Sequence, residues 1–427
     1  MQLPDTAPFT APQRLALTSA LADLSPAQID WLRGHLASPT PPTTATAAPG
    51  EPATFGKKNP FPARLKHRRL LNGPGSAKET WHLEFDIAGS GMSYEPGDAL
   101  GLIPRNAPDV VDAVLEAAGL HGETMVEVKE IGRVTLRDAF TNHLDITGLN
   151  SVILGKYNLI AKSEKLSSLL DPTTGDSLGV FLRGRQMIDM LEIFPIPGLD
   201  AQDLVGVLRK MPPRLYSIAS SAKTHPGEVH LTIAAVRYES HGKIRKGVAS
   251  TFIADILAEQ DTTKVYTHTN KNFKLPPSGD TPIIMVGPGT GIAPFRAFIE
   301  DRAASGATGK SWLFFGDQHA ACDFIYHEEW EAYVQTGILT RMDTAFSRDQ
   351  QDKIYVQHRM IENARDLWSW LEAGAHFYVC GDASRMAADV HTALIQIAMQ
   401  QGNLSLADAE AYCENLKKSK RYQRDVY

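Results

Sequence analysis

From Thr281 onward, short apolar stretches alternate with amphipathic ones, and this alternation limits the fold more than any other feature. The apolar stretches include "PIIMVG", "SWLFFG" and "HFYVCGD", and the segments between them include "APFRAFIEDRAA" and "HEEWEAYV". Strands that are apolar along their whole length are buried on both faces, and amphipathic helices cover them. The pattern therefore predicts an α/β domain with a doubly wound parallel sheet over residues 276–427.

The hydrophobic period changes twice before that point. Residues 55–104 alternate as strands do, for example in "TWHLEFDI", and strands return later with "RLYSIAS" and "VHLTIAAVRYE". Between them, residues of about 106–200 follow the helical period, as in "APDVVDAVLEAAGL". All-β sequence interrupted by mostly helical sequence indicates a β-barrel domain over residues 55–275 with a helical insertion.

The first 37 residues form a short N-terminal helical segment in this interpretation. Ser25 is a suitable N-cap, and Ile29, Leu32 and Leu36 repeat at helical spacing to form one apolar face. Residues 38–54 are rich in Pro, Thr and Ala and are typical of a linker. The apolar face either packs on the main body or mediates self-assembly with another subunit, and the sequence leaves both open.

Composition excludes several classes of protein. The chain has 427 residues and a net charge of -6, which argues against nucleic-acid binding. No apolar run is long enough for a membrane span, and the first residues lack the features of a secretory signal. The 3 cysteines are scattered without a CxxC pattern, so neither a disulfide framework nor a metal site is expected. We expect a soluble cytoplasmic protein.

A glycine-rich turn follows the first apolar strand of the α/β region, in "IIMVGPGTGIAPF". Gly287, Gly289 and Gly291 would let the backbone approach a ligand, and Thr290 with the helix N-terminus would offer donors to a phosphate. The spacing differs from both the P-loop and the G-x-G-x-x-G fingerprint. A tight strand–helix turn without a ligand is the alternative.

Three further stretches carry polar groups that suit a nucleotide ligand. In "FSRDQQDKIYVQ", cationic and hydroxyl groups could hold a phosphomonoester, although a solvated polar loop is the simpler interpretation. "YVCGD" ends an apolar strand, where Cys380 either faces a ligand or is a small buried hydrophobe. "PRLYSIASS" is either an exposed polar strand or the holder of a flat anionic ligand.

These stretches, taken in order with "KGVAST", "FFGDQHAACDFIYHEEW" and the C-terminal "RYQRDVY", resemble the ferredoxin–NADP reductase superfamily. More narrowly they are similar to the diflavin reductases, and above all to the reductase half of sulfite reductase flavoproteins. The resemblance covers residues 55–427. The segment "LTSALADLSPAQIDWLRGHLA" is also similar to the start of those flavoproteins, where it is linked to subunit assembly.

The resemblance implies two cofactors, FAD and NADPH, and a set of residues for each. The expected FAD-binding residues are Arg214, Tyr216, Ser217, Tyr238, Gly247, Val248, Ala249, Ser250, Thr251 and Tyr427. The expected NADP-binding residues are Gly287, Gly289, Thr290, Ser347, Arg348, Lys353, Tyr355 and Gln357. Those expected to act in hydride transfer are Ser217, Cys380, Asp425 and Tyr427.

The sequence departs from the diflavin pattern in two ways. Only the linker lies between the N-terminal helices and the FAD domain, so no FMN domain is expected there. Asp317 and Gln318 also stand where many relatives have a basic residue, which would remove one phosphate contact. Electrons would then leave to a separate sulfite reductase haemoprotein, flavodoxin or ferredoxin. A general ferredoxin/flavodoxin–NADP reductase and a non-catalytic assembly subunit are the alternatives.

Overall fold

The computed structural model describes Ser25 and residues 55–427, and residues 54–427 form one compact unit. The helices expected over residues 1–37 and the linker over 38–54 lie outside the described residues, apart from Ser25.

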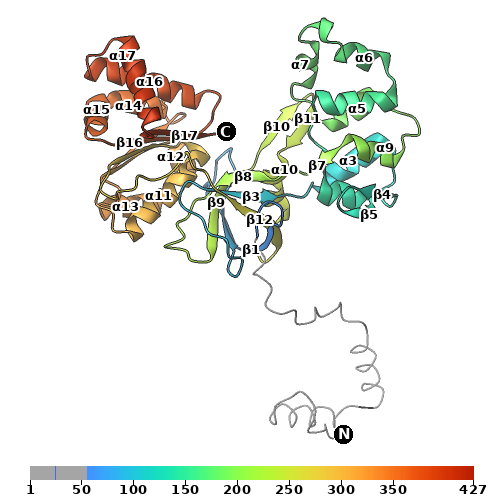
Figure 1. Cartoon of the computed structure of the whole chain (residues 1–427), viewed down its shortest axis with the longest axis horizontal. Coiled ribbons are helices and arrows are strands. Elements are labelled where there is room, and N and C mark those ends of the chain that lie inside the picture. The colour runs from blue at the N-terminus through green and yellow to red at the C-terminus, as the bar shows by residue number, and fades with distance from the viewer. Residues whose placement is uncertain (1–24, 26–54) are drawn as a thin grey trace. The chain divides into compact units, whose positions relative to one another are not determined.

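The first half of this unit is built on an antiparallel sheet (Figure 1). Its strand order is β8-β3-β12-β1-β2-β9, and the strands are β1 (Phe61–Leu70), β2 (Thr80–Asp86), β3 (Ala99–Ile103), β8 (Arg214–Ser217), β9 (Glu228–Ala234) and β12 (Thr262–His268). Alternate side chains such as Leu83, Phe85 and Leu231 are buried in one core. An isolated bridge also pairs Ile218, just after β8, with Leu231 of β9, so it joins the two edge strands.

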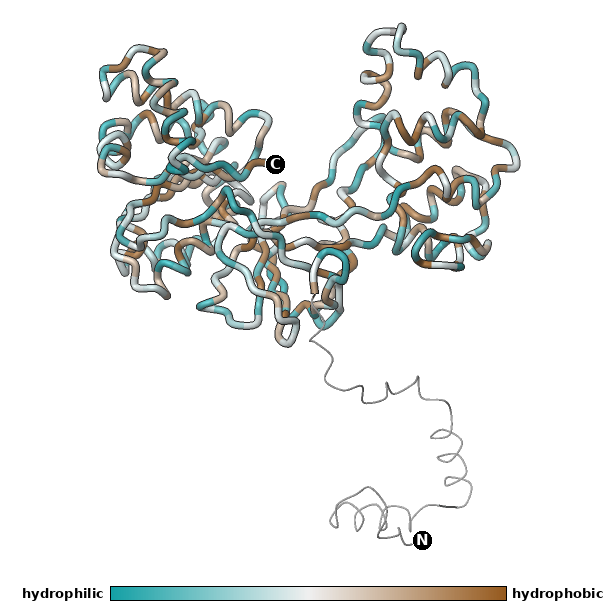
Figure 2. The backbone as a smooth tube through the Cα atoms, in the orientation of Figure 1, coloured by the Kyte–Doolittle hydropathy of each residue, from teal (hydrophilic) through white to brown (hydrophobic). Residues whose placement is uncertain are grey.

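The insertion between β3 and β8 has a hydrophobic core of its own, which includes Phe140, Leu154 and Met190. Its helices are α3 (Pro108–Ala118), α4 (Leu136–Asp138), η1 (Ala139–His143), α5 (Ser151–Ala161), α6 (Glu164–Leu170), η2 (Pro172–Thr174), α7 (Ser177–Leu182), α8 (Met187–Ile193) and α9 (Ala201–Val207). Its tube in Figure 2 alternates hydrophobic and hydrophilic stretches, as amphipathic helices do.

The insertion is less uniformly helical than the sequence period suggested. It contains the hairpin β4 (Met125–Val128) and β5 (Gly132–Thr135), and it ends where β6 (Leu144–Asp145) pairs with β7 (Arg209–Lys210). It therefore continues past residue 200, because α9 still packs in the insertion's core.

After β9 the chain makes a small excursion before it returns to the sheet. The predicted strand "VHLTIAAVRYE" is split, because β10 (Arg237–Ser240) leaves the sheet and pairs with β11 (Lys243–Lys246). The short helices α10 (Val248–Thr251) and η3 (Phe252–Ile256) follow. This excursion places the "GVAST" segment at one cavity with Arg214 and Tyr216 of β8.

The second half is the predicted parallel sheet, with strand order β15-β14-β13-β16-β17. Its strands are β13 (Ile283–Val286), β14 (Ser311–Asp317), β15 (Arg341–Phe346), β16 (His376–Gly381) and β17 (Tyr422–Val426). The order reverses between β13 and β16, and ligands of open α/β sheets bind beyond the carboxyl ends of the strands at such a point.

Helices cover both faces of this sheet (Figure 1). One core, with Met285, Leu313 and Phe315 from the strands, lies under α11 (Ala293–Ala304) and α13 (His327–Gln335). The other lies under α14 (Val356–Glu362), α15 (Ala364–Glu372), α16 (Met386–Gln401) and α17 (Leu406–Lys418). The short helices η4 (Gly289–Ile292) and α12 (Ala320–Asp323) complete the set. None of the helices in the described part is long and apolar enough to span a membrane.

A buried polar interface joins α11 to the first sheet. Arg296 donates to the Ala219 carbonyl at 2.7 Å, and the Ser221 amide donates to Glu300 at 2.8 Å. The Ser221 hydroxyl donates to Asp301 at 2.8 Å. Of the serines in "PRLYSIASS", Ser221 thus serves domain packing, and this packing brings the end of β8 against β17.

Histidines of the first sheet lie at the same interface. His82 and His230 are buried, and His82 Nδ1 is 2.9 Å from the Tyr326 hydroxyl. Burial is the main cause of the low pKa values of both imidazoles, about 2 for His82 and about 4 for His230. Their ring nitrogens lie near Glu84 and Glu228, and the Arg296 guanidinium also opposes a positive charge there. The structure thus buries both histidines in their neutral form.

Candidate functional site

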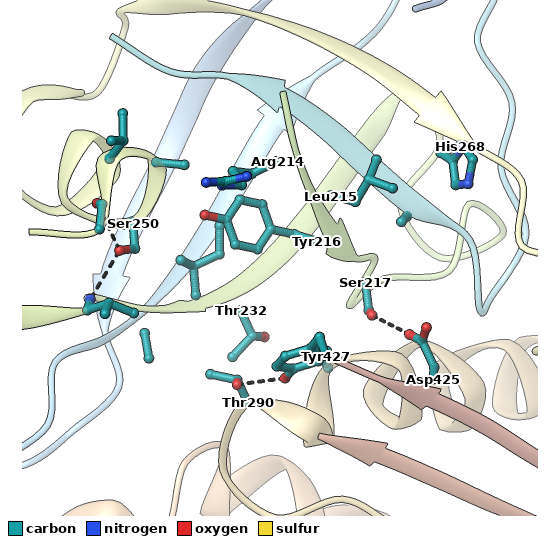
Figure 3. Close-up of a pocket in the computed structure, with 18 of the residues that line it drawn as sticks. Arg214, Leu215, Tyr216, Ser217, Thr232, Ser250, His268, Thr290, Asp425 and Tyr427 are labelled. Atoms are coloured by element: carbon teal, nitrogen blue, oxygen red, sulfur yellow. Dashed lines mark hydrogen bonds between the residues drawn. The ribbon is translucent and has the colours of Figure 1, made fainter. Parts of the chain in front are cut away.

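A cavity of about 600 Å³ lies where β8, β9 and α10 approach the C-terminal strand β17 (Figure 3). Predicted FAD residues line it, namely Arg214, Tyr216, Ser217, Gly247, Val248, Ala249, Ser250 and Tyr427. Tyr238 and Thr251 do not: Tyr238 is exposed on β10, and the Thr251 hydroxyl donates to the Gly247 carbonyl at 3.0 Å. The structure thus brings most, though not all, of the residues predicted to bind FAD to one cavity.

Arg214 and Tyr216 reach this cavity from the same strand. Both side chains lie on one side of β8 because residues two apart in a strand point the same way, and Figure 3 shows them together. Among the described residues the Arg214 side chain has no hydrogen bond or ion pair, so it is free to neutralise an anion. Burial raises the pKa of the Tyr216 phenol, which therefore stays neutral.

The N-terminus of α10 borders the same cavity. Gly247 leaves no room for a side chain, since a Cβ there would lie 2.7 Å from Ser250 Oγ and 3.0 Å from Val236 Cβ. The Ser250 hydroxyl is already engaged, because it accepts from the Val236 amide at 3.1 Å. The first backbone N–H groups of a helix lack intrahelical acceptors, so they remain available to a phosphate.

Ser217, Cys380 and Asp425 come together although they are far apart in the sequence. Cys380 of β16 and Asp425 of β17 are direct partners in the parallel sheet, and Ser217 Oγ donates to Asp425 Oδ2 at 2.7 Å. Cys380 is fully buried, and burial together with Asp425 raises the pKa of its thiol well above the usual value. Burial also raises the pKa of Asp425, partly offset by the hydrogen bond from Ser217.

The C-terminal residue closes one side of this group. The Tyr427 amide donates to the Gly381 carbonyl at 3.1 Å, and the Tyr427 hydroxyl lies 2.8 Å from Thr290 Oγ1 (Figure 3). Thr290, predicted to meet a pyrophosphate, is thus engaged with Tyr427. Tyr427 as a whole is 64% exposed.

A second cavity of about 430 Å³ lies beyond the carboxyl ends of β13, β14 and β16. Of the predicted NADP residues, Gly289, Ser347, Tyr355 and Gln357 line it. Arg348 and Lys353 do not line it, and both are exposed in the loop between β15 and α14. Neither of these two side chains has an ion pair or hydrogen bond within the described part of the chain.

The glycines of the turn after β13 have different roles. Gly289 has a φ of 57°, which favours glycine, and it lines the second cavity. Gly287 instead allows close packing, since a Cβ there would lie 2.6 Å from the Phe295 ring. At Gly291 a Cβ would lie 2.1 Å from the Cys380 carbonyl oxygen. The structure thus places only Gly289 of the three at this cavity.

A third cavity of about 480 Å³ shares lining residues with each of the other two. Thr290 and Tyr427 line the first and third cavities, whereas Gly289 and Asp382 line the second and third. A long ligand in the second cavity could therefore extend toward the first, with the Tyr427 ring between the two.

Several residues at these cavities were not predicted from the sequence. Lys78, in the loop between β1 and β2, lines the second and third cavities, and Arg385 lines the second. His268 and Asn270 line the first, and Asn270 Nδ2 lies 3.4 Å from Asp425 Oδ1. Lys78 and Asn270 could not be found by motif, because each lies far in sequence from the residues it joins.

The residues fit the two cofactors expected from the resemblance. The first cavity offers an aromatic side chain, an unpaired guanidinium and free helix N–H groups, which suit a flat ring and a pyrophosphate. The second offers a glycine turn, a hydroxyl and a phenol beside an exposed cationic loop, which suit a nucleotide with an additional phosphate.

Comparison with known proteins agrees with this division. Residues 53–252 match the model of the FAD binding domain, and residues 285–392 match that of the oxidoreductase NAD-binding domain. The chain is 45% identical over 407 residues to the "sulfite reductase [NADPH] flavoprotein alpha-component" of Bacillus subtilis, covering 93% of this chain and 67% of the relative. It is 46% identical over 398 residues to the alpha-component of Vibrio cholerae, covering 93% of this chain and 64% of the relative. The chain thus spans about two thirds of the length of these relatives.

Proposed function

The chain belongs to the family of the flavoprotein alpha-components of NADPH sulfite reductase, and we propose that it takes a hydride from NADPH onto FAD and passes electrons to a separate acceptor. It is an NADPH-dependent flavoprotein oxidoreductase with two cofactor domains. The observation that carries the proposal is the meeting of Ser217, Cys380 and Asp425 beneath Tyr427, where the two cavities approach each other.

FAD, when bound, supplies the redox chemistry, because it accepts two electrons together and can release them singly. The residues of the chain hold and orient the reactants. Arg214 would neutralise the flavin pyrophosphate, and Tyr216 and Tyr427 would lie against the two faces of the ring. Tyr238 would contact the adenine, and the "GVAST" segment, Gly247 to Thr251, would donate to the pyrophosphate.

Ser217, Cys380 and Asp425 would set the geometry of hydride transfer. The buried Cys380 thiol stays protonated, since its pKa is raised by burial, so it presents a small neutral group. Ser217 holds the Asp425 carboxylate in a fixed orientation. Positioning of this kind removes the entropic cost of bringing two reactants together.

The exposed loop would select NADPH over NADH. Arg348, Lys353 and Ser347 would bind the 2′-phosphate that only NADPH carries, with Tyr355 at the adenine and Gln357 beside it. The residues proposed to bind the NADPH pyrophosphate are Gly287, Gly289 and Thr290. The proposal has most support for Gly289, because Gly289 lines the second cavity.

The acceptor is a proposal as well. Because its relatives are named for sulfite reductase, we propose a haemoprotein subunit of that enzyme as the acceptor of this chain. A flavodoxin or ferredoxin is the second candidate, since the FAD–NADPH unit would serve either one.

We further propose that the N-terminal segment supports self-assembly. We also propose that the protein is cytoplasmic, because all 3 cysteines are free. The bridge between Ile218 and Leu231 supports closure of the first sheet as a barrel.

An anaerobic visible spectrum tests the proposed function. The purified protein should show one bound FAD per chain, bleached quickly by one equivalent of NADPH and slowly by NADH. The reduced protein should then be mixed with a sulfite reductase haemoprotein and, separately, with a flavodoxin and a ferredoxin. A colourless protein, or a flavin that NADPH does not reduce, would contradict the proposal, and the acceptor that reoxidises the flavin fastest would identify the partner.

A further inference from the structure

A half-buried ion pair lies beside the glycine turn at the proposed pyrophosphate position. Lys78 Nζ pairs with Asp317 Oδ1, and the Asp317 side chain is only 3% exposed. Both residues line the second and third cavities with Gly289. A Cβ placed on Gly289 would be 3.9 Å from both Lys78 Nζ and Asp317 Oδ2, so the pair lies directly beside the glycine turn.

Lys78 is held in this place by its own loop. The Lys78 amide donates to Ser76 Oγ at 2.9 Å, and Ser76 in turn donates to the buried Asp323 of α12. Asn72 also donates to Asp323, at 2.9 Å, and the Gly73 amide donates to the Cys322 carbonyl at 2.8 Å. The loop therefore presents the lysine to the carboxyl end of the parallel sheet, whether or not Asp317 is present.

Of the carboxylates that line this cavity, Asp317 is the one that forms an ion pair with a lysine among the described residues. Asp382 also lines the cavity, but it accepts from the amides of Arg385 and Met386 at 2.8 and 3.2 Å. Asp389 accepts from Gln357 at 3.3 Å. Asp317 accepts at Oδ1 from Lys78 and from the Gln318 amide at 2.6 Å, while no hydrogen bond to its Oδ2 is found within the described residues.

We propose that Asp317 is an internal counter-anion that the pyrophosphate of NADPH displaces from Lys78, so that it weakens the binding of NADPH and NADP⁺ and speeds product release. This inference rests on the proposed function, because it assumes that the second cavity binds NADPH. Asp317 acts through Lys78 and is therefore an affinity-setting residue that takes no part in hydride transfer itself.

A purely orienting role for Asp317 predicts the opposite change in NADP⁺ affinity. If Asp317 only kept Lys78 oriented for the ligand, its removal would weaken binding. If it competes for the lysine, its removal frees the ammonium and strengthens binding, because one like charge beside the phosphates is gone. The direction of the change therefore distinguishes the two roles.

Calorimetric titration of the FAD-loaded protein tests the proposal without using activity. Asp317→Asn should lower the Kd of NADP⁺ about tenfold, which corresponds to about 1.4 kcal/mol. The Kd of 2′-AMP, which carries the 2′-phosphate but no pyrophosphate, should stay within about twofold of the wild-type value. Asp112→Asn removes the same charge at an exposed position of the insertion and should change neither constant.

A double-mutant cycle tests whether Asp317 acts through the lysine. Lys78→Met should weaken NADP⁺ binding, and adding Asp317→Asn to that variant should strengthen it by less than about threefold. If Asp317→Asn does not bind FAD, Asp317→Ser serves as a second variant, provided that its FAD content equals that of the wild type.

Each outcome decides the question. Tighter NADP⁺ binding that depends on Lys78 supports the inference. Unchanged or weaker binding in the Asp317 variants overturns it, as does a full tenfold gain without Lys78. If the wild type binds neither NADP⁺ nor 2′-AMP, the proposed function fails and the inference fails with it. If the wild type binds both, a null result in Asp317→Asn overturns this inference alone.

Discussion

The residues proposed to set the geometry of hydride transfer and those of the loop between β15 and α14 are held in opposite ways. A hydrogen bond joins Ser217 of the first sheet to Asp425 of the second, and Cys380 is buried in a core of the second sheet beside Asp425. Arg348 and Lys353 are exposed, and their side chains find no partner among the described residues. The first set is preorganised by folding, whereas the second remains available to its ligand. This difference separates catalysis, which needs fixed geometry, from specificity, which needs an unsatisfied charge.

The largest effect should come from the preorganised set. Asp425→Asn keeps the size of the side chain but removes its charge, so kcat for NADPH-driven ferricyanide reduction should fall about 100-fold. The FAD content should stay the same, because most residues that line the first cavity come from β8, β9 and the segment around α10. Asp112→Asn serves as the charge-matched control. A kcat within about threefold of the wild type would show that Asp425 does not position the reactants.

The exposed loop should affect cofactor choice without affecting the chemical step. Arg348→Ala should raise KM for NADPH roughly 30-fold and leave KM for NADH nearly unchanged, because only NADPH has the 2′-phosphate. Steady-state kinetics with both cofactors measure this. Arg365→Ala removes an exposed arginine on α15 and provides the control. An equal rise for NADPH and NADH would refute the assignment of Arg348 to the phosphate.

Tyr427 lines the first and third cavities and should show a smaller effect than Asp425 or Arg348. Its replacement by Ala should expose the flavin face and lower the ratio of kcat/KM for NADPH over NADH about tenfold. The reason is that NADPH would no longer gain from its extra phosphate in displacing the ring. Measuring kcat/KM for both cofactors gives this ratio. An unchanged ratio would remove Tyr427 from the specificity mechanism.

The smallest effect concerns stability at the interface between the sheets. Below pH 6.5 the unfolded chain protonates His82 and His230, whereas the folded chain keeps them neutral down to their lowered pKa values of about 2 and about 4. The free energy of unfolding should therefore decrease as the pH falls, by at most about 1.4 kcal/mol per pH unit for each histidine.

Urea unfolding at pH 7, 6 and 5 measures this slope. His230→Gln should reduce the slope of the free energy of unfolding between pH 6 and 5 by about 1 kcal/mol per pH unit. His225 should contribute no slope in this range, because its pKa is raised by the hydrogen bond to Glu300 and its stabilising effect is already complete below pH 6.5. A slope that is identical in the wild type and in His230→Gln would show that the imidazole is not buried in solution.

Periodicity was sufficient for the three central strands β14, β13 and β16 of the parallel sheet but not for its edge strands β15 and β17. The "IIMV" strand is buried throughout, as its composition predicts. β17 was not predicted, because "YQRDV" has no apolar run and becomes a strand only by pairing with β16. That pairing places Asp425 beside Cys380, so the local sequence of the C-terminus could not reveal its role.

The sequence by itself determined the order of the two cofactor domains, the cationic loop and the residue types at both cavities, because these depend on local patterns. Only the tertiary structure decided which of those residues meet. It paired Ser217 with Asp425, brought Lys78 to Asp317 and used Gly287 and Gly291 for packing. The physical reason is that most of these contacts, such as Ser217–Asp425, Lys78–Asp317 and Gly291–Cys380, join strands and loops far apart in the sequence. Their geometry follows from how whole sheets pack.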